Sequence, residues 1–545
     1  MGALTYLIGF ADIATGVAPG WRQRLHPLTD LLPGAIAAAS AATVVSGILL
    51  LLLAHALRRR KRRAWRAGVA LLSVSVALHA VRLELVPLAM SLAVLIALIG
   101  YRAEFRALGD PTTRWRAVRT FFVLAAASLV VGMLMVLLLR HHVVGGPPSV
   151  AGTFQEVLAG LVGFSGPLAY RSDRVSDLND FVLTGLGLMT ALTTIYLALR
   201  APEPRPELTD ADEASMRSLL QRSPDSLGYF NLRRDKSVIW SDSGKAAIAY
   251  RVVSGVMLAS GDPLGDSEAW PGAISSFLAE AERHAWTPAV IGCSERAGSI
   301  WCRVSGFSAL ELGDEAVVDV PAFSLDGRPM RNVRQMVRRI ERAGYTTEIL
   351  RTGDVSEGER RRALADAEAW RGTETERGFS MALGRLVDPV DPDCVFVVAR
   401  QDGVMRAFLQ FVPWGTDGMS LDLMRRDRTA DAGVNELLIV DALRLCPALG
   451  VNRVSLNFAA FRSALERGER LGAGPFLRGW RRVLLLASRR FQIESLYRFN
   501  AKFQPTWVPR FAVYPSARDL PRVVMAALEA EAFLTWPHLR RFSGA

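Results

Sequence analysis

The sequence predicts an α-helical membrane domain followed by an α/β soluble region made of two similar units. Long apolar runs are confined to the first 200 residues, and the proline-rich segment 201–207 follows them directly. After this segment, strand-like and helix-like stretches alternate, and the alternation occurs twice. A chain of 545 residues is also too long for one hydrophobic core. We therefore expect a membrane domain at 1–200 and two soluble units at 201–350 and 351–545.

The first 200 residues contain five or six candidate transmembrane helices. Residues 1–18 are apolar enough to form the sixth despite Asp12, and they lack the basic start of a signal peptide. Arg82 and Glu84 lie between two short runs, which indicates a tight hairpin. The other five runs have roughly membrane-spanning length: 34–57, 67–84, 85–101, 119–139 and 181–199.

Positive charge is concentrated beside these runs. The net charge is +12, and residues 1–200 hold 19 Lys+Arg against 9 Asp+Glu, whereas the remainder is almost balanced. The loops 58–66 and 101–119 carry seven and five cations, so the positive-inside rule places both in the cytoplasm. Alternating the spans then puts loop 140–180 outside and the soluble region inside. The sequence predicts a multi-pass protein of the inner or plasma membrane, whose basic loops set the topology or also attract anionic lipids.

The soluble region has few residues suited to metal binding or covalent catalysis. Its only histidines are His284 and His538, so neither a histidine-based triad nor a His-ligated metal site is expected. Four scattered cysteines form no C-x-x-C pair and would face a reducing compartment, so we expect neither zinc nor disulfides. No serine or cysteine nucleophile stands out, which argues against a covalent acyl-enzyme.

Periodicity locates the elements of the soluble region. Helices are expected at about 268–285, 328–343, 356–371 and 434–446. Strands are expected at 237–241, 246–253, 255–260, 289–294, 316–321, 394–401, 405–413, 419–426 and 453–459. This order suits two α/β units of about 150 residues each, although the pattern alone fits several α/β folds.

The segment Gln492–Phe511 has the most distinctive residue pattern in the chain. Apolar residues recur at helical spacing, and Glu494, Arg498 and Lys502 form a charged stripe at i, i+4 and i+8. Pro505 ends this helix, and a stiff extended segment containing Arg510 follows. The stripe could grip a polar substrate; the alternative is a solvated row of salt bridges.

An aspartate lies inside the apolar strand SLDLMRR, which ends in two arginines. Strict alternation would put Asp422 on the same face as Arg426, with Arg425 on the other face. The strand leads into a helix whose expected N-cap is Asp431, and such a junction is a common ligand site. A buried carboxylate is costly unless it is paired, so the alternative is a structural aspartate–arginine pair.

The helix at 328–343 presents a row of arginines. Arg331, Arg334, Arg338 and Arg342 share one face, opposite an apolar face. Such a row suits the successive phosphates of a tRNA acceptor stem, and the alternative is a solvated basic face. Other polar groups near strand ends are more often structural than catalytic; these are Asn457, Glu466, Glu469 and the turn-like GDPLGD at 261–266.

Six ordered motifs resemble those of the lysyl-phosphatidylglycerol synthases, the multiple-peptide-resistance-factor family. The resemblance covers nearly all of residues 205–515. The motifs are RPMRNVRQMVRRIERAGY (328–345), ERGFSMALGRL (376–386), SLDLMRR (420–426), VNELLIVDALR (434–444), VSLNFAAFRS (454–463) and QIESLYRFNAKFQPTWVPRF (492–511).

The resemblance implies a fold and an activity. The two soluble units would be GNAT-like acyltransferase units anchored to the membrane. They would move an amino acid, with lysine expected, from aminoacyl-tRNA to phosphatidylglycerol or a related lipid, without another cofactor. Such a change in envelope charge would raise resistance to cationic peptides. The span number is below that of family members that also flip the product, so flippase activity is not expected.

The resemblance and the chemistry together suggest roles for the polar residues. Asp422 would orient or deprotonate the lipid hydroxyl, or hold the ammonium of the amino acid. Arg425 and Lys502 would stabilise negative charge, and Glu494 would hold Lys502 or the amino acid. Asp422→Asn and Lys502→Ala should each lower product formation about a hundredfold or more. Substrate binding is expected of Arg426, Arg498, Arg510, Asn457, Glu466, Arg331, Arg334 and Arg338.

Three alternatives remain open. The acceptor could be an amino-lipid or a cell-wall precursor, because transferases for such precursors also use paired GNAT-like domains. An acyl-CoA-dependent acetyltransferase fits less well, since the loop 427–433 holds only one glycine for a phosphate-binding turn. The chain could also be a membrane sensor or scaffold with an inactive soluble region.

Overall fold

The computed structural model groups the chain into two compact units, essentially Met1–Pro202 and Glu203–Ala545. Each unit is considered by itself. The structure describes residues 62–81, 85–102, 111–164, 166–199, 204, 208–221, 223–372, 378–460 and 493–534.

A helical hairpin opens the described part of the first unit. It joins α4 (Arg62–Val81) to α5 (Leu85–Gly100), which matches the hairpin expected from the two short apolar runs. The indole N–H of Trp65 donates a hydrogen bond to the carbonyl of Leu98, 2.7 Å away. Both helices bury apolar side chains against each other; these are Ala64, Leu72, Val94 and Leu98.

Three more helices form the other described part of this unit: α6 (Pro111–Leu138), α7 (Val150–Leu161) and α8 (Asp173–Leu199). The short 3-10 turn η3 (Arg140–His142) follows α6. A side chain at Gly187 would place its Cβ 1.8 Å from the carbonyl oxygen of Leu161, so only glycine lets α8 approach α7 this closely. The three helices α6, α7 and α8 together bury Val136, Val157 and Leu183.

Among the described residues, two helical stretches are long and apolar enough to cross a membrane. They are Val118–Leu138 in α6 and Asp173–Ile195 in α8, at the expected runs 119–139 and 181–199. The apolar stretches Ala64–Ala77 of α4 and Leu85–Gly100 of α5 are shorter. The runs 1–18 and 34–57 lie outside the described residues. Five or six spans therefore stay a prediction, of which two are supported directly.

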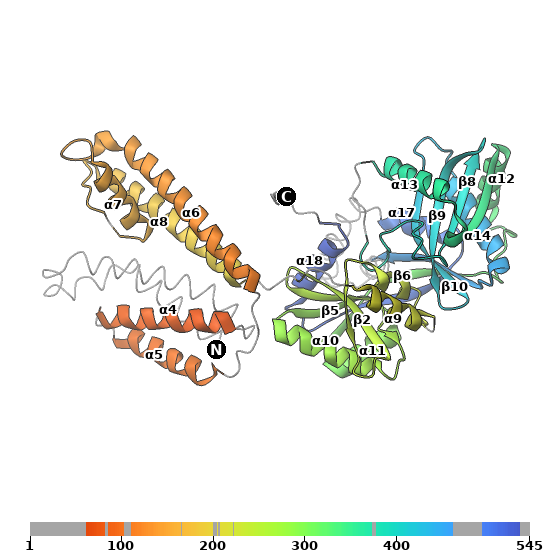
Figure 1. Ribbon diagram of the computed structural model, residues 1–545, viewed down its shortest axis with the longest axis horizontal. Coiled ribbons are helices and arrows are strands. Elements are labelled where there is room, and N and C mark those ends of the chain that lie inside the picture. Colours follow the sequence, from red (N-terminus) through yellow and green to blue (C-terminus); the bar gives the residue numbers. More distant parts are fainter. Residues whose placement is uncertain are drawn as a thin grey trace, which may run out of the picture. The chain divides into compact units, whose positions relative to one another are not determined.

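A single mixed β-sheet runs through the described part of the second unit (Figure 1). Its strands lie in the order β1-β2-β3-β5-β12-β6-β11-β10-β9-β8-β7, and β4 pairs with β2. The strands are β1 (Ser237–Trp240), β2 (Ala246–Val253), β3 (Val256–Ser260), β4 (Leu264–Gly265), β5 (Thr287–Cys293), β6 (Ser308–Asp319), β7 (Tyr345–Arg351), β8 (Val395–Gln401), β9 (Val404–Trp414), β10 (Gly418–Arg426), β11 (Arg453–Ala460) and β12 (Thr506–Tyr514).

The helices expected from periodicity are present within a few residues of their expected bounds. The charged-stripe helix ends at Ala501, before Pro505, and the stiff segment after it is the strand β12. The helices of this unit are α9 (Asp210–Leu220), α10 (Trp270–His284), α11 (Glu295–Ser305), α12 (Arg331–Arg342), α13 (Glu357–Arg371), α14 (Val434–Leu445), α17 (Ile493–Ala501) and α18 (Leu520–Ala530), with 3-10 turns η4 (Gly228–Leu232), η5 (Thr352–Asp354) and η6 (Cys446–Leu449).

One arrangement occurs twice in the sheet. In the first half, β3 leads through α10 to β5, and the two strands pair in parallel. In the second half, β10 leads through α14 to β11, again as a parallel pair. This repetition agrees with the expected pair of α/β units. The expected boundary between 350 and 351 falls inside β7, and the sheet is continuous across both halves.

The two halves also exchange strands. The C-terminal strand β12 lies between β5 and β6, antiparallel to both. The strand β6, from the first half, pairs in turn with β11 of the second. The first half of the sheet is therefore completed by a strand from the C-terminal part of the chain.

Different helices cover the two faces of the second half (Figure 1). On one face, α12 and α14 bury Val337, Ile340 and Leu438 in a large apolar core, which Phe499 and Phe503 at the end of α17 also join. On the other face, α13 packs through Ala363 against Phe396 and Phe408 of β8 and β9. Predicted site residues can contact one another directly only if their side chains lie on the same face.

Candidate active site

The parallel strands β10 and β11 separate after a short common stretch. They pair at only three positions, Gly418–Ser420 with Arg453–Ser455, although both strands continue beyond them. Asp422 and Asn457 each lie two residues past the last pair. Ligands of open α/β sheets bind beyond the carboxyl ends of such strands, so the point where β10 and β11 separate is a candidate ligand site.

A register shift in β10 decides where its charged residues point. The pairing with β9 jumps between Leu421 and Leu423, so Asp422 is a bulged extra residue. Beyond the bulge, Arg425 pairs with Phe408, on the face covered by α13, whereas Arg426 pairs with Ala407, on the α14 face. The alternation expected for an ideal strand was therefore wrong.

The bulge puts Asp422 and Arg425 on the same face of the sheet. The Asp422 carboxylate accepts a hydrogen bond from the side-chain amide of Gln410, a neighbour on that face, at 2.6 Å. Its other oxygen accepts from the backbone N–H of Leu383 at 2.7 Å. Sequence analysis considered an arginine partner for this carboxylate only as the structural alternative, and it missed Gln410. The lone glutamine in the strand AFLQFV was visible as a signal.

Asn457 holds the opposite strand at the same point. It has a left-handed backbone, with φ of 69°, within the register shift between β11 and β6. Asparagine tolerates this conformation better than most residues. Its side-chain amide donates to the carbonyl of Leu421 at 2.9 Å and to that of Met381 at 3.0 Å. Asn457 thus bridges β10 and a loop where the ladder between the strands has ended.

The loop reached by Asp422 and Asn457 belongs to the motif ERGFSMALGRL. We call residues 378–387 the clamp segment. At its start, the carboxylate of Glu531 accepts from the backbone N–H groups of Phe379 and Ser380, at 2.7 and 3.0 Å. At its end, Gln410 accepts from the N–H of Val387 at 2.7 Å. Side chains from the end of α18 and from β9 therefore fix the clamp segment.

Lys502 lies on the other face of the sheet, with α14 and α17. Its ammonium group is 2.7 Å from a carboxylate oxygen of Glu436, in the first turn of α14. The same ammonium lies over the ring of Phe499, 5.1 Å from its centre. The side chain of Glu494, the expected partner, is outside the described side chains. Lys502 and Asp422 thus stand on opposite faces beside the strands that separate.

The arginine row of α12 has the expected two faces. Val333, Val337 and Ile340 are buried, whereas Arg331 and Arg338 are exposed. Arg334 is half-buried and donates to the backbone carbonyl of Leu325, so it also fixes the approach to the helix.

The loop before α14 is tied to α12. Arg339 donates to the carbonyl of Ala432, and the residue that caps α14 is Gly433, with φ of 112°. The expected N-cap, Asp431, was wrong by two residues, because only glycine readily adopts this backbone conformation. Arg331 and Arg338 consequently lie on a helix that is attached to the junction between β10 and α14.

Arg510 is buried at the place in the first half that corresponds to Asp422 and Asn457. Its guanidinium donates to Asp225 at 2.7 Å and, through Nε, to Glu315 at 2.9 Å. The remaining donors reach Ser226, Glu315 and the carbonyl of Gly292, just beyond the parallel pair of β3 and β5. All five N–H groups are used, so none is left for a substrate, and we reassign Arg510 to the connection between the halves.

Asp262, in the GDPLGD turn, extends this buried network. Its carboxylate accepts from the backbone N–H and the hydroxyl of Ser294, at 2.7 and 2.6 Å. Burial, and then the neighbouring Asp225 carboxylate, raises the pKa of Asp262 to about 7. The first repeat is thus filled by an internal ion network, whereas Asp422 and Asn457 in the second repeat are only half-buried.

The remaining predicted site residues are half-buried, exposed or outside the described residues. Arg425 is half-buried, and both Arg426 and Arg498 are exposed. Arg426 donates to the carbonyl of Ala430 at 3.3 Å, within its own loop. Glu466 and its neighbour Glu469 lie outside the described residues.

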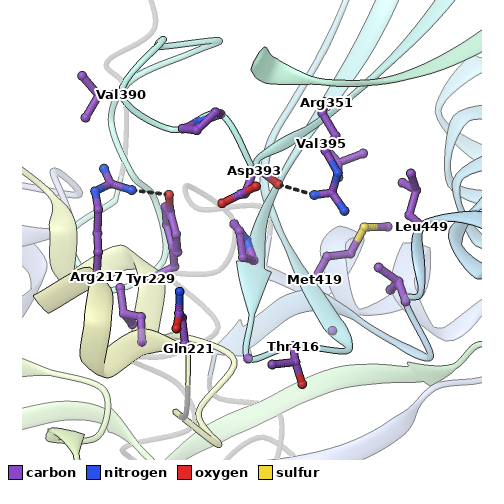
Figure 2. A pocket seen from close by; sticks show the side chains of 16 residues that line it. Arg217, Gln221, Tyr229, Arg351, Val390, Asp393, Val395, Thr416, Met419 and Leu449 are labelled. Atoms are coloured by element: carbon purple, nitrogen blue, oxygen red, sulfur yellow. Dashed lines mark hydrogen bonds between the residues drawn. The ribbon is translucent and has the colours of Figure 1, made fainter. Parts of the chain in front are cut away.

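A separate pocket of about 410 Å³ opens near the start of β10 (Figure 2). Arg217, Gln221 and Tyr229 lie at one end, and Arg351 lies toward the other, beside apolar side chains. Arg351 donates to the carbonyl of Asp393 at 3.1 Å. None of the predicted site residues lines this pocket, whose mixed lining suits a small amphipathic molecule.

A buried lysine near the clamp segment gives a testable pH dependence. Lys236 is fully buried, donates to the hydroxyl of Ser260 at 2.7 Å, and lies 4.6 Å from the ring centre of Phe379. Burial lowers the pKa of Lys236 to about 7. Above pH 7 the unfolded chain therefore binds more protons than the folded chain, and the folded state gains stability as pH rises toward the ordinary lysine pKa.

We expect Lys236→Met to remove this pH dependence. In thermal unfolding of the full chain in detergent, followed by tryptophan fluorescence, the Tm of the wild type should rise relative to the variant between about pH 7 and pH 9. The exposed Lys245 supplies a matched Lys→Met control that should track the wild type. Parallel curves for wild type and Lys236→Met would contradict the expectation.

The repeated β–α–β arrangement places the second unit among the α/β proteins, with two similar halves joined in one sheet. Residues 217–514 match the family model "Phosphatidylglycerol lysyltransferase, C-terminal", and residues 1–200 match "Transmembrane region of lysyl-tRNA synthetase". The chain belongs to the phosphatidylglycerol lysyltransferase family, as its motifs indicated. The second match identifies it as a membrane protein.

Relatives and solved structures agree with this membership. The lysylphosphatidylglycerol biosynthesis bifunctional proteins LysX of Nocardia farcinica and Mycobacterium avium are 51% and 50% identical over 65% of this chain. These matches cover 32% and 30% of the relatives, so the chain spans about a third of their length.

Two solved structures share the fold. The C-terminal domain of a proposed lysylphosphatidylglycerol synthetase from Agrobacterium fabrum has a TM-score of 0.51 at 25% identity, covering 58% of this chain and 96% of that domain. L-PGS from Bacillus licheniformis has a TM-score of 0.53 at 21% identity, covering 62% of this chain and all of that structure.

Proposed function

We propose that this protein transfers an aminoacyl group, with lysine expected, from aminoacyl-tRNA to phosphatidylglycerol or a related anionic lipid. The observation that carries the proposal is the half-buried pair of Asp422 and Asn457 where β10 and β11 separate, in a chain of this family. Two of the most similar relatives are named for lysylphosphatidylglycerol biosynthesis. The resulting loss of negative charge would lower the attraction of cationic peptides to the envelope.

The reaction exchanges one ester for another. The lipid glycerol hydroxyl attacks the ester carbonyl carbon of aminoacyl-tRNA, and the bond from that carbon to the ribose oxygen breaks. The hydroxyl proton ends on the ribose oxygen, so atoms and charge balance without ATP. The protein has to bring two large substrates together, and such positioning alone can remove several kcal/mol of barrier.

The proposed roles follow the positions of the side chains. Asp422 would orient the attacking hydroxyl or accept its proton, and Arg425, on the same face, would stabilise the tetrahedral intermediate. Lys502 stands on the other face with Glu436 as its ion-pair partner, so it would reach the reacting groups from the side of α14. Glu494 and Arg498 would assist substrate binding from the adjacent helix.

The exposed face of α12 is the proposed contact for the tRNA. Arg331 and Arg338 point to solvent on a helix tied to the β10–α14 junction, so bound phosphates would lie near the reacting ester. The membrane domain would hold the soluble region, on the cytoplasmic side, within reach of lipid headgroups. A multi-pass arrangement with five or six spans would meet this requirement.

The test uses the full chain in vesicles that contain phosphatidylglycerol, with lysyl-tRNA as donor. We expect lysyl-phosphatidylglycerol by mass spectrometry, and its loss when RNase is added before the enzyme. Parallel vesicles with an amino-lipid, and reactions with a soluble cell-wall precursor, identify the acceptor. No aminoacylated product with any acceptor would contradict the proposal and favour a sensor or scaffold.

A further inference from the structure

Gln410 is a polar residue in an apolar strand, and its side chain is almost completely buried at 1% exposure. The amide nitrogen donates to the carboxylate of Asp422 at 2.6 Å and to the carbonyl of Arg385 at 2.8 Å. The amide oxygen accepts from the N–H of Val387 at 2.7 Å. One side chain thus connects the proposed catalytic carboxylate to the end of the clamp segment.

The surroundings fix the orientation of the Gln410 amide. A flipped amide would face its oxygen toward the carbonyl of Arg385 and its N–H₂ toward the N–H of Val387, and both contacts would repel. Gln410 therefore presents an N–H to Asp422. Because Leu383 also donates an N–H to this carboxylate, both oxygens of Asp422 accept hydrogen bonds.

We infer that Gln410 is a positioning residue for the acyl transfer, one that acts through Asp422. It fixes the orientation of the carboxylate at the bulge of β10, and it also binds the end of the clamp segment. A residue needed only for packing would not use its oxygen and both N–H groups on defined partners. The inference rests on the proposed function, since Asp422 has its role only in that reaction.

The variant Gln410→Glu tests this inference, because glutamate has nearly the same size. Glutamate must carry a proton to donate to Asp422, and this single O–H cannot also donate to the carbonyl of Arg385. At low pH the two carboxyl groups can therefore share one proton, whereas the hydrogen bond to Arg385 is lost. As pH rises both ionise, and like charges at hydrogen-bond distance repel. We expect the kcat of the variant relative to wild type to fall about tenfold from pH 6 to pH 8, with KM for lipid nearly unchanged.

Each rate is taken as a ratio to wild type with the same aminoacyl-tRNA stock, which cancels the hydrolysis of the ester. Thr347→Val is the matched control, since it removes another side-chain hydrogen bond to a carboxylate, at 2.7 Å to Asp441, elsewhere in the sheet. Its ratio should not change with pH. A second variant, Gln410→Met, should lose about tenfold in kcat at every pH without a new pH dependence.

The outcomes separate the inference from the proposed function. An active wild type with a pH-independent ratio for Gln410→Glu overturns the role of Gln410 and leaves the function intact. If Gln410→Glu does not fold, Gln410→Met decides, and a kcat within about twofold of wild type overturns the role. A wild type that forms no product overturns the proposed function, and this inference falls with it.

Discussion

Replacing Asp422 with asparagine is expected to lower the rate of lipid aminoacylation by about a hundredfold or more, roughly 2.7 kcal/mol in the barrier. The carboxylate receives N–H groups from Gln410 and Leu383, so both of its oxygens must accept. Asparagine has only one accepting oxygen, and its N–H₂ group would face one of these donors. The substitution therefore removes the negative charge and also misaligns the side chain.

The measurement is the initial rate of product formation by the full chain in phosphatidylglycerol vesicles, together with the Tm. Asp417→Asn is the matched control, because Asp417 lies in the β9–β10 turn and forms an exposed ion pair with Arg453. Such pairs contribute little, so this variant should retain its rate within about twofold. A normal rate for Asp422→Asn would remove the residue from the site.

The sequence predicted the elements of the soluble region better than their connections. Regular periodicity located α12 and β10, because a helix or strand buries one face whatever lies beyond it. The bulge at Asp422 was not predictable, since it depends on how β9 and β10 fit between other strands. Nor was the position of β12 between β5 and β6, because strand order depends on long-range pairing.

In the candidate site too, individual residues could be predicted better than their contacts. Asp422 and Asn457 could be singled out as polar groups in or just past apolar strands, and the structure brings both to the clamp segment. Arg510 was expected to bind substrate, but the insertion of β12 between β5 and β6 buries it among carboxylates. The partner Gln410 was overlooked because an uncharged side chain draws less notice than an arginine, although its burial gives it the same need for partners.

Loss of the Arg510 guanidinium is expected to have the largest effect on stability. Arg510→Met would leave Asp225 and Glu315, whose side chains are 0% and 1% exposed, without their cation. Breaking a buried pair in this way costs about 3–5 kcal/mol, so the Tm should fall by roughly 10 °C.

Two further variants separate charge from shape. Arg510→Lys keeps the charge but offers three donors in place of five, so its Tm should lie between those of wild type and Arg510→Met. Arg518→Met removes an exposed arginine in the same region of sequence and should change stability by less than about 0.5 kcal/mol. If Arg510→Met unfolds no more readily than Arg518→Met, strand β12 is not held by this network. The backbone hydrogen bonds and apolar contacts of β12 would then be what joins the two halves.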